Sequence, residues 1–464
     1  MKDLKNLKIA YIGGGSHSWA KNLMVDLARE EAICGTVSLY DIDVKAAESN
    51  ARIGAFLAER DDVVSKWKYV VANDIEDALT GADVVVISIL PGTFDEMESD
   101  VHLPEKYGIY QSVGDTTGPG GIVRALRAAP MFAYFAENIK KYCPQSWVIN
   151  FTNPMTVCTR TLYKVFPQIK AFGCCHEVFG TQDLFKEILK EKRGIDAKRE
   201  EIEVNVLGVN HFTWLDKVCY KGEDLLPLYR EFIEENAEGR EGTDKEHWAN
   251  SSFAQKNKVK FDLFCRYGLI AAAGDRHLAE FCPSDWYLKD PETVRSYGFE
   301  LTPVSWRKKD LAWRIEVAEK LSSGEKQLDF YRTGEECVRQ IKAIFGLGSF
   351  LTNVNLPNRG QMPQLPLNAV IETNAYFSGD DVRPVVAGNL PQGVLALVQR
   401  ICAEQEMVAE AALTGNYELA FQAFLNNPNM PLDIKAAREL FDEMLKRTKK
   451  YLPYYEAYVK REKA

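Results

Sequence analysis

The stretch LKIAYIGGGS (residues 7–16) decides how the first half of this chain folds. A short β-rich run ends in three glycines, and SWAKNLMVDLARE (18–30) then places apolar residues at helical spacing. Glycines at such a strand-to-helix turn let the backbone approach a pyrophosphate, and the helix N-terminus offers oriented N–H groups to its oxygens. The stretch therefore predicts a first strand, a phosphate-binding turn and a first helix.

Strands and helices continue to alternate after this turn. The strands expected next are TVSLYDID (36–43), KYVVAND (68–74) and DVVVISIL (83–90), and the helices between them are AAESNARIGAFLAER (46–60) and DIEDALTGA (74–82). Alternation of this kind indicates βαβ units and a parallel sheet. We predict an α/β protein with a Rossmann-type, doubly wound, mostly parallel sheet over residues 1–200. A mixed α+β domain with C-terminal helices, residues 201–464, is expected to complete the site.

The glycine turn has the neighbours that a dinucleotide site needs. Asp41 and Asp43 stand at the end of the second strand, where a carboxylate binds ribose hydroxyls and disfavours a 2′-phosphate. The pattern departs from the usual fingerprint because Ser18 occupies the third glycine slot, and glycines also serve plain tight turns. With strand, helix and acid in register, the sequence favours NAD over NADP. The predicted cofactor-binding residues are Gly13, Gly14, Gly15, Ser16, Asp41 and Ser88.

Composition argues against several classes of partner. The net charge of −9 and the pI near 5.5 disfavour nucleic acid and anionic membranes, because both require concentrated positive charge. The longest apolar run, VVVISIL (84–90), is too short to cross a bilayer, and the N-terminal segment has the pattern of a strand rather than a signal peptide. Ten scattered cysteines without a CxxC pair fit reduced thiols, so we expect a cytoplasmic protein.

Two further loops follow strands at the same expected sheet edge. GDTTGPGGIVRALR (114–127) carries Asp115 and Arg124, and NFTNPM (150–155) places Asn153 directly after the fifth strand. Ligands collect at the carboxyl edge of such sheets, although a solvated helix face and a helix-capping asparagine would explain the same residues. A strand that ends in Asn-Pro is also typical of lactate and malate dehydrogenases. A 2-hydroxy-acid dehydrogenase is therefore among the hypotheses.

Two strand ends carry residues that bind metals. AFGCCHEVFG (171–180) places Cys174, Cys175 and His176 after the sixth strand, and VNVLGVNH (204–211) ends another strand at His211. One thiolate and one imidazole on neighbouring strand ends could form a partial, open site for a transition metal. Buried free cysteines and hydrogen-bonded histidines are also common, so the spacing leaves both interpretations open. A redox pair is disfavoured because adjacent cysteines seldom bridge.

Taken together, the motifs resemble glycoside hydrolase family 4, the NAD- and manganese-dependent glycosidases. They occur in one order along the chain: IGGGS, LYDID, GDTTGPGGIVRALR, NFTNPM, CCHEVFGT and GVNHFTW. The resemblance runs from Lys8 into the C-terminal half, where TNVNLPNRGQMPQLP (352–366) is similar to a family segment. Within the family, CCHEVFGTQ together with AAAGDRHLAEF (271–281) resembles the α-galacturonidase branch more closely than the α-galactosidase or α-glucosidase branches.

The resemblance implies a mechanism that is an exception to the two-carboxylate scheme of most glycosidases. Bound NAD⁺ takes hydride from C3 of the sugar, a base removes the acidified C2 proton, the glycosidic oxygen leaves, water adds, and the hydride returns. A divalent cation, Mn²⁺ or another, stabilises the developing negative charge. The implied roles are Cys175 and His211 as metal ligands, His176 as general acid with Glu177 as a less favoured substitute, Asp275 as base, and Asp115 and Asn153 as substrate contacts.

Two assignments are inferences from the residues themselves. Arg276 and His277 follow Asp275, and either of them, or Arg124, could pair with the carboxylate of a uronic acid, since arginine suits bidentate contact. Cys174 doubles the expected metal ligand. We expect it to be a packed strand residue.

The expected activity is hydrolysis of terminal α-linked galacturonic acid, with the same chemistry on a neutral α-glucoside or α-galactoside as the alternative. A 2-hydroxy-acid dehydrogenase or a silent NAD-binding sensor is the hypothesis from another class. A homodimer or homotetramer is implied by the resemblance only. Residues 390–428 are predicted to form two helices, and residues 232–248, with a solvated His247, a surface insertion.

Overall fold

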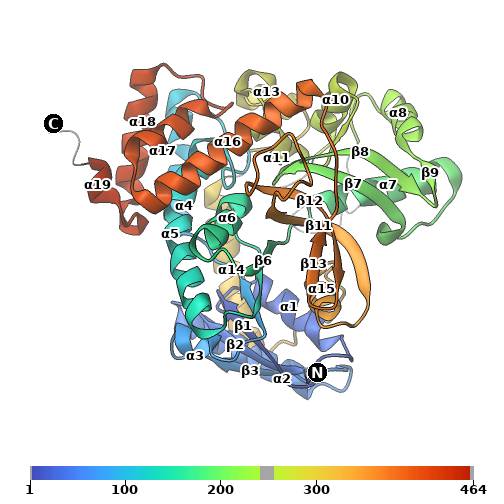
Figure 1. The fold of residues 1–464 in the computed structure, drawn as a ribbon, viewed down its shortest axis with the longest axis vertical. Helices are drawn as coiled ribbons and strands as arrows, with labels where there is room; N and C mark the ends of the chain where they lie inside the picture. The colour runs from blue at the N-terminus through green and yellow to red at the C-terminus, as the bar shows by residue number, and fades with distance from the viewer. Residues whose placement is uncertain (1–2, 241–254, 302, 460–464) are drawn as a thin grey trace.

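A nine-stranded sheet joins the two halves of the chain (Figure 1), with the strand order β13-β12-β11-β6-β5-β4-β1-β2-β3. The computed structural model describes residues 3–240, 255–301 and 303–459, so the predicted insertion lies partly, and His247 wholly, outside the described residues. The strands from the first half are β1 (Leu7–Ile12), β2 (Gly35–Tyr40), β3 (Lys68–Val71), β4 (Val84–Ile87), β5 (Trp147–Asn150) and β6 (Lys170–Gly173). They pair in parallel in the order 3-2-1-4-5-6 of dinucleotide-binding folds. The predicted Rossmann-type sheet is confirmed.

Both faces of this sheet are buried, as its apolar strands require. In β1, Ile9 and Tyr11 belong to one core cluster, whereas Ala10 and Ile12 belong to another on the opposite face. Successive side chains of a strand point to opposite faces, so a strand with helices on both sides carries a continuous apolar run. The covering helices from this half are α1 (Trp19–Ala28), α2 (Val44–Glu59), α3 (Ile75–Leu79), α5 (Gly118–Tyr142) and α6 (Met155–Val165). This half also contains α4 (Phe94–His102), which packs on α5, α7 (Glu177–Arg193), which packs on β7 (Ile202–Val209) of a second sheet, and a short 3₁₀ turn η1 (Pro104–Tyr107).

The C-terminal half extends the same sheet with three antiparallel strands. These are β11 (Ser349–Pro357), β12 (Val370–Ser378) and β13 (Asp381–Pro384), and Asn355 of β11 pairs with Gly173 of β6. Strands from the second half of the chain thus complete the edge of a sheet whose other strands come from the first half. The boundary at residues 200 and 201 stays a prediction.

A smaller sheet and several helices make up the rest of the second half. The sheet contains β7 (Ile202–Val209), β8 (Phe212–Tyr220), β9 (Glu223–Asp224) and β10 (Ile270–Ala271). Beside it are α8 (Leu226–Glu235), α10 (Lys258–Tyr267), α11 (Asp275–Glu280), α12 (Ser284–Tyr287) and α13 (Pro291–Ser296), with η2 (Arg199–Glu201). Two further helices pack on the N-terminal half: α14 (Val304–Ser322) on α2 and α4, and α15 (Cys337–Ile344) on the main sheet. This mixture of strands and helices confirms the predicted α+β character.

The C-terminal helices form a separate layer, drawn in orange and red at the top of Figure 1. They are α16 (Gln392–Thr414), α17 (Tyr417–Asn426), α18 (Ile434–Thr448) and α19 (Tyr455–Val459), with η3 (Lys449–Tyr451). Their apolar faces share one core cluster with Ile122, Val123 and Leu126 of α5. The two helices predicted between residues 390 and 428 are therefore present. Val394, Leu395 and Val398 of α16 pack in the core of the second half, and the later turns of α16, together with α17, pack on α5.

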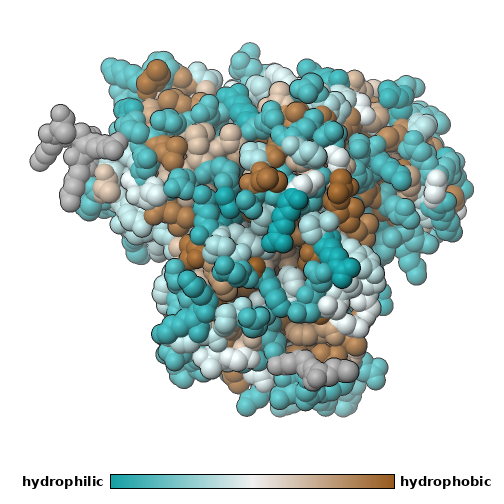
Figure 2. Space-filling model, in the orientation of Figure 1, coloured by the Kyte–Doolittle hydropathy of each residue, from teal (hydrophilic) through white to brown (hydrophobic). Residues whose placement is uncertain are grey.

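The face of the molecule in Figure 2 is mostly hydrophilic, with small apolar patches scattered between polar residues. Among the described residues, no helix combines the length and the hydropathy that crossing a membrane requires.

The turn after β1 leads to a first prediction. Gly13 has a φ of +96°, and a Cβ built on it would lie 1.9 Å from the carbonyl oxygen of Ser88. We expect Gly13→Ala to lower the free energy of unfolding by more than about 2 kcal/mol, because backbone strain and a backbone clash add. Urea denaturation measures this loss.

Gly81→Ala is the matched control. Gly81 has a similar φ of +71°, but nothing lies within 4 Å of its added Cβ. It should lose only about 1 kcal/mol, the cost of the left-handed backbone for alanine. Equal losses in the two variants would contradict the close approach at Ser88.

Candidate functional site

A cavity of about 460 Å³ opens at the carboxyl edge of the main sheet. Its walls come from segments far apart in the sequence: Trp19, Val113, Asp115, Phe151, Asn153, Met155, Cys174, Cys175, His176, Glu177, His211, Gln255, Gly274, Arg276, His277 and Arg307. A concave site of this size with a few convergent polar groups is typical of a ligand-binding pocket. Most of the residues predicted to bind the metal, to act as the general acid or to contact the substrate line this one cavity.

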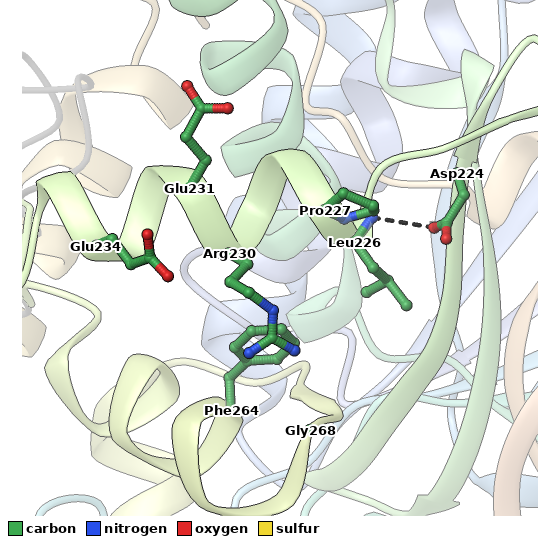
Figure 3. A pocket seen from close by; sticks show the side chains of 8 residues that line it. All are labelled: Asp224, Leu226, Pro227, Arg230, Glu231, Glu234, Phe264 and Gly268. Atoms are coloured by element: carbon green, nitrogen blue, oxygen red, sulfur yellow. Dashed lines mark hydrogen bonds between the residues drawn. The ribbon is translucent and has the colours of Figure 1, made fainter.

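A second hollow lies on the surface beside α8 and α10 (Figure 3). There the guanidinium of Arg230 lies over the ring of Phe264, 5.2 Å from its centroid, and Glu231 and Glu234 lie along the same helix. None of the predicted site residues lines it. It is a surface groove beside charged helix residues, and we assign no chemistry to it.

The predicted cofactor residues gather around the turn that follows β1. The amides of Gly13 and Gly14 donate to the carbonyl oxygen of Tyr40, and the amide of Gly15 donates to Oδ2 of Asp41 at 2.8 Å. Ser88 adjoins Gly13 across the sheet. The turn thus has the short backbone approach that a pyrophosphate needs, with a carboxylate at the end of the neighbouring strand.

The start of α1 completes this region. The hydroxyl of Ser16 accepts from the amide of Trp19 at 3.1 Å, and Asn50 donates to the carbonyl oxygens of Gly14 and Ser16. These contacts hold the turn without any bound ligand. Since Trp19 also lines the cavity, the dinucleotide turn and the cavity lie next to each other.

Cys175 and His211 both line the cavity, although they come from different sheets. Cys175 follows β6, and His211 lies in the turn between β7 and β8. Glu372 of β12 connects them, because its carboxylate accepts from Asn210 at 2.9 Å and from Asn353 at 2.6 Å. Asn353 also donates to the carbonyl oxygen of Cys175 at 3.2 Å.

The protonation of the pair suits an open metal site. Burial, helped by His277, lowers the pKa of His211 to about 3, so its ring is neutral and can donate a lone pair. Its Nδ1 lies 3.1 Å from the hydroxyl of Thr116, which orients the ring. Burial and the charges of Glu372 and Glu177 raise the pKa of the Cys175 thiol well above its usual range. A nearby cation would be needed to hold the thiolate.

Cys175 and His211 are the two side chains predicted to bind a metal, and that assignment stays a prediction. Within residues 3–240, 255–301 and 303–459, no group of three or more His, Cys, Asp and Glu side chains is arranged to hold a metal ion. Cys174, by contrast, packs in the core of the main sheet as expected, where Gln340 donates to its sulfur at 3.5 Å.

His176 and Glu177 begin α7 at the mouth of the cavity. The side chain of His176 is 50% exposed, and its Nδ1 lies 3.4 Å from Glu335. Partial desolvation would lower the pKa of His176, but the hydrogen bond and charge of Glu335 raise it to about 9. Burial would raise the pKa of Glu177, but His277, His211 and His176 lower it to about 2. At neutral pH the pair is an imidazolium beside a carboxylate.

Asp115 and Asn153 face each other in the same wall. The amide of Asn153 lies 3.5 Å from Oδ2 of Asp115, and the hydroxyl of Thr116 donates to Oδ1 at 2.7 Å. Burial would raise the pKa of Asp115, but Arg124, His277 and His211 hold it well below its usual range. Arg124 donates to the carbonyl oxygen of Asn153 at 3.1 Å. An ionised carboxylate and an amide at this position can bind sugar hydroxyls.

Asp275 has a different setting from the other predicted residues. Its neighbours Gly274 and Arg276 line the cavity, but Asp275 does not. Its Oδ1 accepts from the amide of Lys260 at the start of α10, while Oδ2 is buried without a hydrogen-bond partner. Burial raises the pKa of Asp275 to about 6, close to neutral pH. Its role as base stays a prediction, and the carboxylate also stabilises the N-terminus of α10.

Sequence reasoning missed several residues of the wall. Arg307 enters it from α14, and Trp19, Phe151 and Gln255 come from three further segments. In the sequence VSWRKKDLAWR (304–314), Arg307 is one of several charged residues, and no pattern distinguishes it from the others. Only the packing of α14 against α4 and α2 brings this one side chain to the cavity.

Comparisons with known proteins cover most of the chain. The model described as "Family 4 glycosyl hydrolase" matches residues 8–191, and the one described as "Family 4 glycosyl hydrolase C-terminal domain" matches residues 206–430. The chain is 59% identical over 449 residues to an alpha-galacturonidase of Thermoanaerobacterium saccharolyticum, with 96% of this chain and 97% of the relative covered. It is 30% identical over 459 residues to an alpha-galactosidase of Bacillus subtilis, with 97% and 99% covered.

Solved structures show the same fold. A crystal structure from Bacillus subtilis superposes with a TM-score of 0.91 at 52% identity, covering 95% of this chain and 100% of the other. A 6-phospho-beta glucosidase from Thermotoga maritima, solved with manganese, NAD⁺ and glucose-6-phosphate, superposes with a TM-score of 0.76 at 22% identity, covering 96% and 99%. At that identity the second likeness concerns the fold alone.

Proposed function

The chain belongs to the family 4 glycosyl hydrolases, and from that premise we propose that it is an α-galacturonidase that uses NAD and a divalent cation. The observation that carries the proposal is the 59% identity to an alpha-galacturonidase over 96% of the chain, against 30% to an alpha-galactosidase of similar coverage. The substrate would be a terminal α-linked galacturonic acid. Manganese is the cation we expect first, since a manganese-containing structure shares this fold.

The residues of the cavity, and of the glycine turn beside it, fit NAD and a divalent cation. Gly13, Gly14, Gly15 and Ser16 would hold the pyrophosphate of NAD, with Asp41 at the ribose and Ser88 beside the turn. Cys175 and His211 would bind the cation as thiolate and neutral imidazole. When bound, NAD would accept a hydride from the sugar and return it, and the cation would polarise sugar oxygens as a Lewis acid.

Side chains of the protein would transfer the protons and orient the sugar. His176, an imidazolium at neutral pH, is proposed to donate a proton to the leaving glycosidic oxygen. Asp275 is proposed to accept the proton from C2; its pKa is raised to about 6, and the role requires its carboxylate, which does not line the cavity, to reach the sugar. Asp115 and Asn153 would hold hydroxyls of the sugar, and Arg276 its carboxylate.

Two further proposals concern the setting of the reaction. A thiolate ligand requires reducing conditions, because an oxidised sulfur loses affinity for metals. We therefore place the enzyme in the cytoplasm, where thiols are kept reduced. We also propose a homodimer or homotetramer, which light scattering on the purified protein would measure.

A substrate panel tests the function. We expect the reduced protein with NAD⁺ and Mn²⁺ to release p-nitrophenol from the α-galacturonide, with far lower activity on the α-galactoside and α-glucoside. Cleavage of the neutral sugars alone would favour the same chemistry on another substrate. Net accumulation of NADH on a 2-hydroxy acid would favour a dehydrogenase, because a glycosidase of this type returns its hydride.

Cys175→Ala tests the metal ligand. Because Cys175 would supply one of two protein donors, we expect the variant to bind Mn²⁺ at least about 10-fold more weakly and to lose turnover. NAD binding, followed by intrinsic tryptophan fluorescence, should be unchanged. Cys402→Ala is the control, since Cys402 is buried in another core cluster and does not line the cavity, and it should leave the affinity for Mn²⁺ as it was. Equal affinities of the two variants for Mn²⁺ would show that Cys175 is not a metal ligand.

Asp275→Asn tests the base. We expect kcat to fall by about 100-fold or more, because an amide cannot accept the proton. The melting temperature should fall only slightly, since the amide oxygen can still accept from Lys260. Asp290→Asn is the control: Asp290 caps α13 in the same way, accepting from Thr293 at 2.7 Å. Full activity of Asp275→Asn would show that Asp275 stabilises the N-terminus of α10 and is not the base.

A further inference from the structure

We propose that Arg276 and Arg307 form a carboxylate-binding subsite that selects a uronic acid over the neutral sugar of the same configuration. This inference rests on the proposed galacturonidase activity and names the residues that would determine its specificity. The two guanidinium groups enter one cavity from different helices, α11 and α14. The cavity also contains the predicted metal ligands, so an anion held there would belong to the sugar being cleaved.

Arg276 is fixed in place by the loop before α5. Its Nη2 donates to the carbonyl oxygen of Ser112 at 2.6 Å, and the hydroxyl of Ser112 donates to the carbonyl oxygen of Arg276 at 2.5 Å. The side chain is 8% exposed and lines the cavity. One of these hydrogen bonds holds the guanidinium and the other holds the backbone of Arg276, so the side chain loses little freedom when it binds an anion.

Arg307 is positioned by the helix that carries it. The first turn of α14 is anchored to α4: the amide of Val304 donates to Nε2 of His102 at 3.0 Å, and Val304 packs against Met97 and Val101. Lys308 pairs with Asp95 at 2.7 Å on the outer side. These contacts hold the start of α14 against α4. Arg307 lies in the same first turn of α14, and its side chain lines the cavity.

The two guanidinium groups lie close enough to repel each other. Burial and the charge of Arg307 lower the pKa of Arg276 to about 10. Glu280 is near Arg276, but its Oε1 accepts the amides of Val113 and Gly114, and burial raises the pKa of Glu280 to about 8. At neutral pH Glu280 is therefore mostly protonated. Asp115 and Asp310 act on Arg307, and Glu177 and Asp115 act on Arg276, so both arginines lie among acids in or near the cavity wall.

The ionised acids of the cavity wall act on the two arginines, and they also have other partners. Asp115 accepts from Thr116 and lies beside Arg124, while Glu177 accepts from Gly274 at 2.9 Å and faces His277 at 3.6 Å. A carboxylate from the substrate would add negative charge where two arginines converge. Arginine binds a planar carboxylate with paired N–H donors, which a hydroxymethyl group cannot match.

The structure also separates these arginines from the other candidates for the carboxylate. Arg124 does not line the cavity, and its guanidinium is directed to Asn153 and Asp115. His277 stacks on His211, with ring centroids 4.2 Å apart, and faces Glu177. Both therefore support the metal and hydroxyl contacts.

Arg307→Gln is the primary test, because Arg276 is tied to a buried loop and its loss could impair folding. We expect kcat/KM for p-nitrophenyl α-galacturonide to fall about 30-fold or more, mainly through KM, since charge-assisted hydrogen bonds to the substrate are lost. Activity on p-nitrophenyl α-galactoside should change less than about 3-fold. The dissociation constant of D-galacturonate, measured by calorimetry, should rise in parallel while that of NAD⁺ stays constant.

Two more variants complete the design. Lys309→Gln removes one positive charge from an exposed position on the same helix and should match the wild type. Arg307→Lys should restore galacturonate binding only in part, because lysine lacks the bidentate fork. Equal losses on the two substrates, or a weakened affinity for NAD⁺, would refute the subsite while leaving the galacturonidase activity intact. A wild-type enzyme that cleaves only neutral sugars would refute both.

Discussion

The buried carboxylate of Glu372 is the contact on which the geometry of the site depends. It accepts from Asn210 beside His211 and from Asn353, which in turn donates to the backbone of Cys175. A carboxylate removed from water is costly unless its oxygens are hydrogen-bonded, and here each oxygen has an amide donor. One side chain of β12 therefore joins the strand end of the main sheet to the turn of the smaller sheet. Asn210 also hydrogen-bonds to the side chain of Cys175, so the two segments meet directly as well.

This arrangement explains why the C-terminal half returns to the N-terminal sheet. β11 pairs with β6 at the point where Cys174 and Cys175 follow, and β12 brings Glu372 to the same edge. A Rossmann-type sheet that ended at β6 would leave this edge open, and exposed strand edges invite unwanted pairing. The added antiparallel strands cover the edge and at the same time bring the residues that orient the site. Stability and site geometry are thus served by the same strands.

The electrostatics of the cavity follow from which groups are buried together. His211 is neutral because burial and His277 oppose its charge, whereas Glu177 stays ionised beside His277 and His176. Asp115 stays ionised beside Arg124 and His277. Each group acquires its charge from neighbours contributed by other segments, as is common where protons are transferred. Arg276 and Arg307 both line this cavity, and we propose that they select an anionic sugar.

The sequence by itself determined the α/β alternation, the glycine turn with Asp41, and the strand ends that carry Cys175, His211, Asp115 and Asn153, because these signals are local patterns of apolar residues, glycines and polar strand ends. It could not place Arg307, Glu372 or Glu335, whose sequence neighbourhoods are ordinary and whose partners lie far away in the chain. It also could not show that Asp275 lies behind the cavity wall, because the direction of a buried side chain depends on the helix packed against it. Only the tertiary structure decided which strand ends meet and what charge each group carries there, since both depend on burial and on contacts between distant segments.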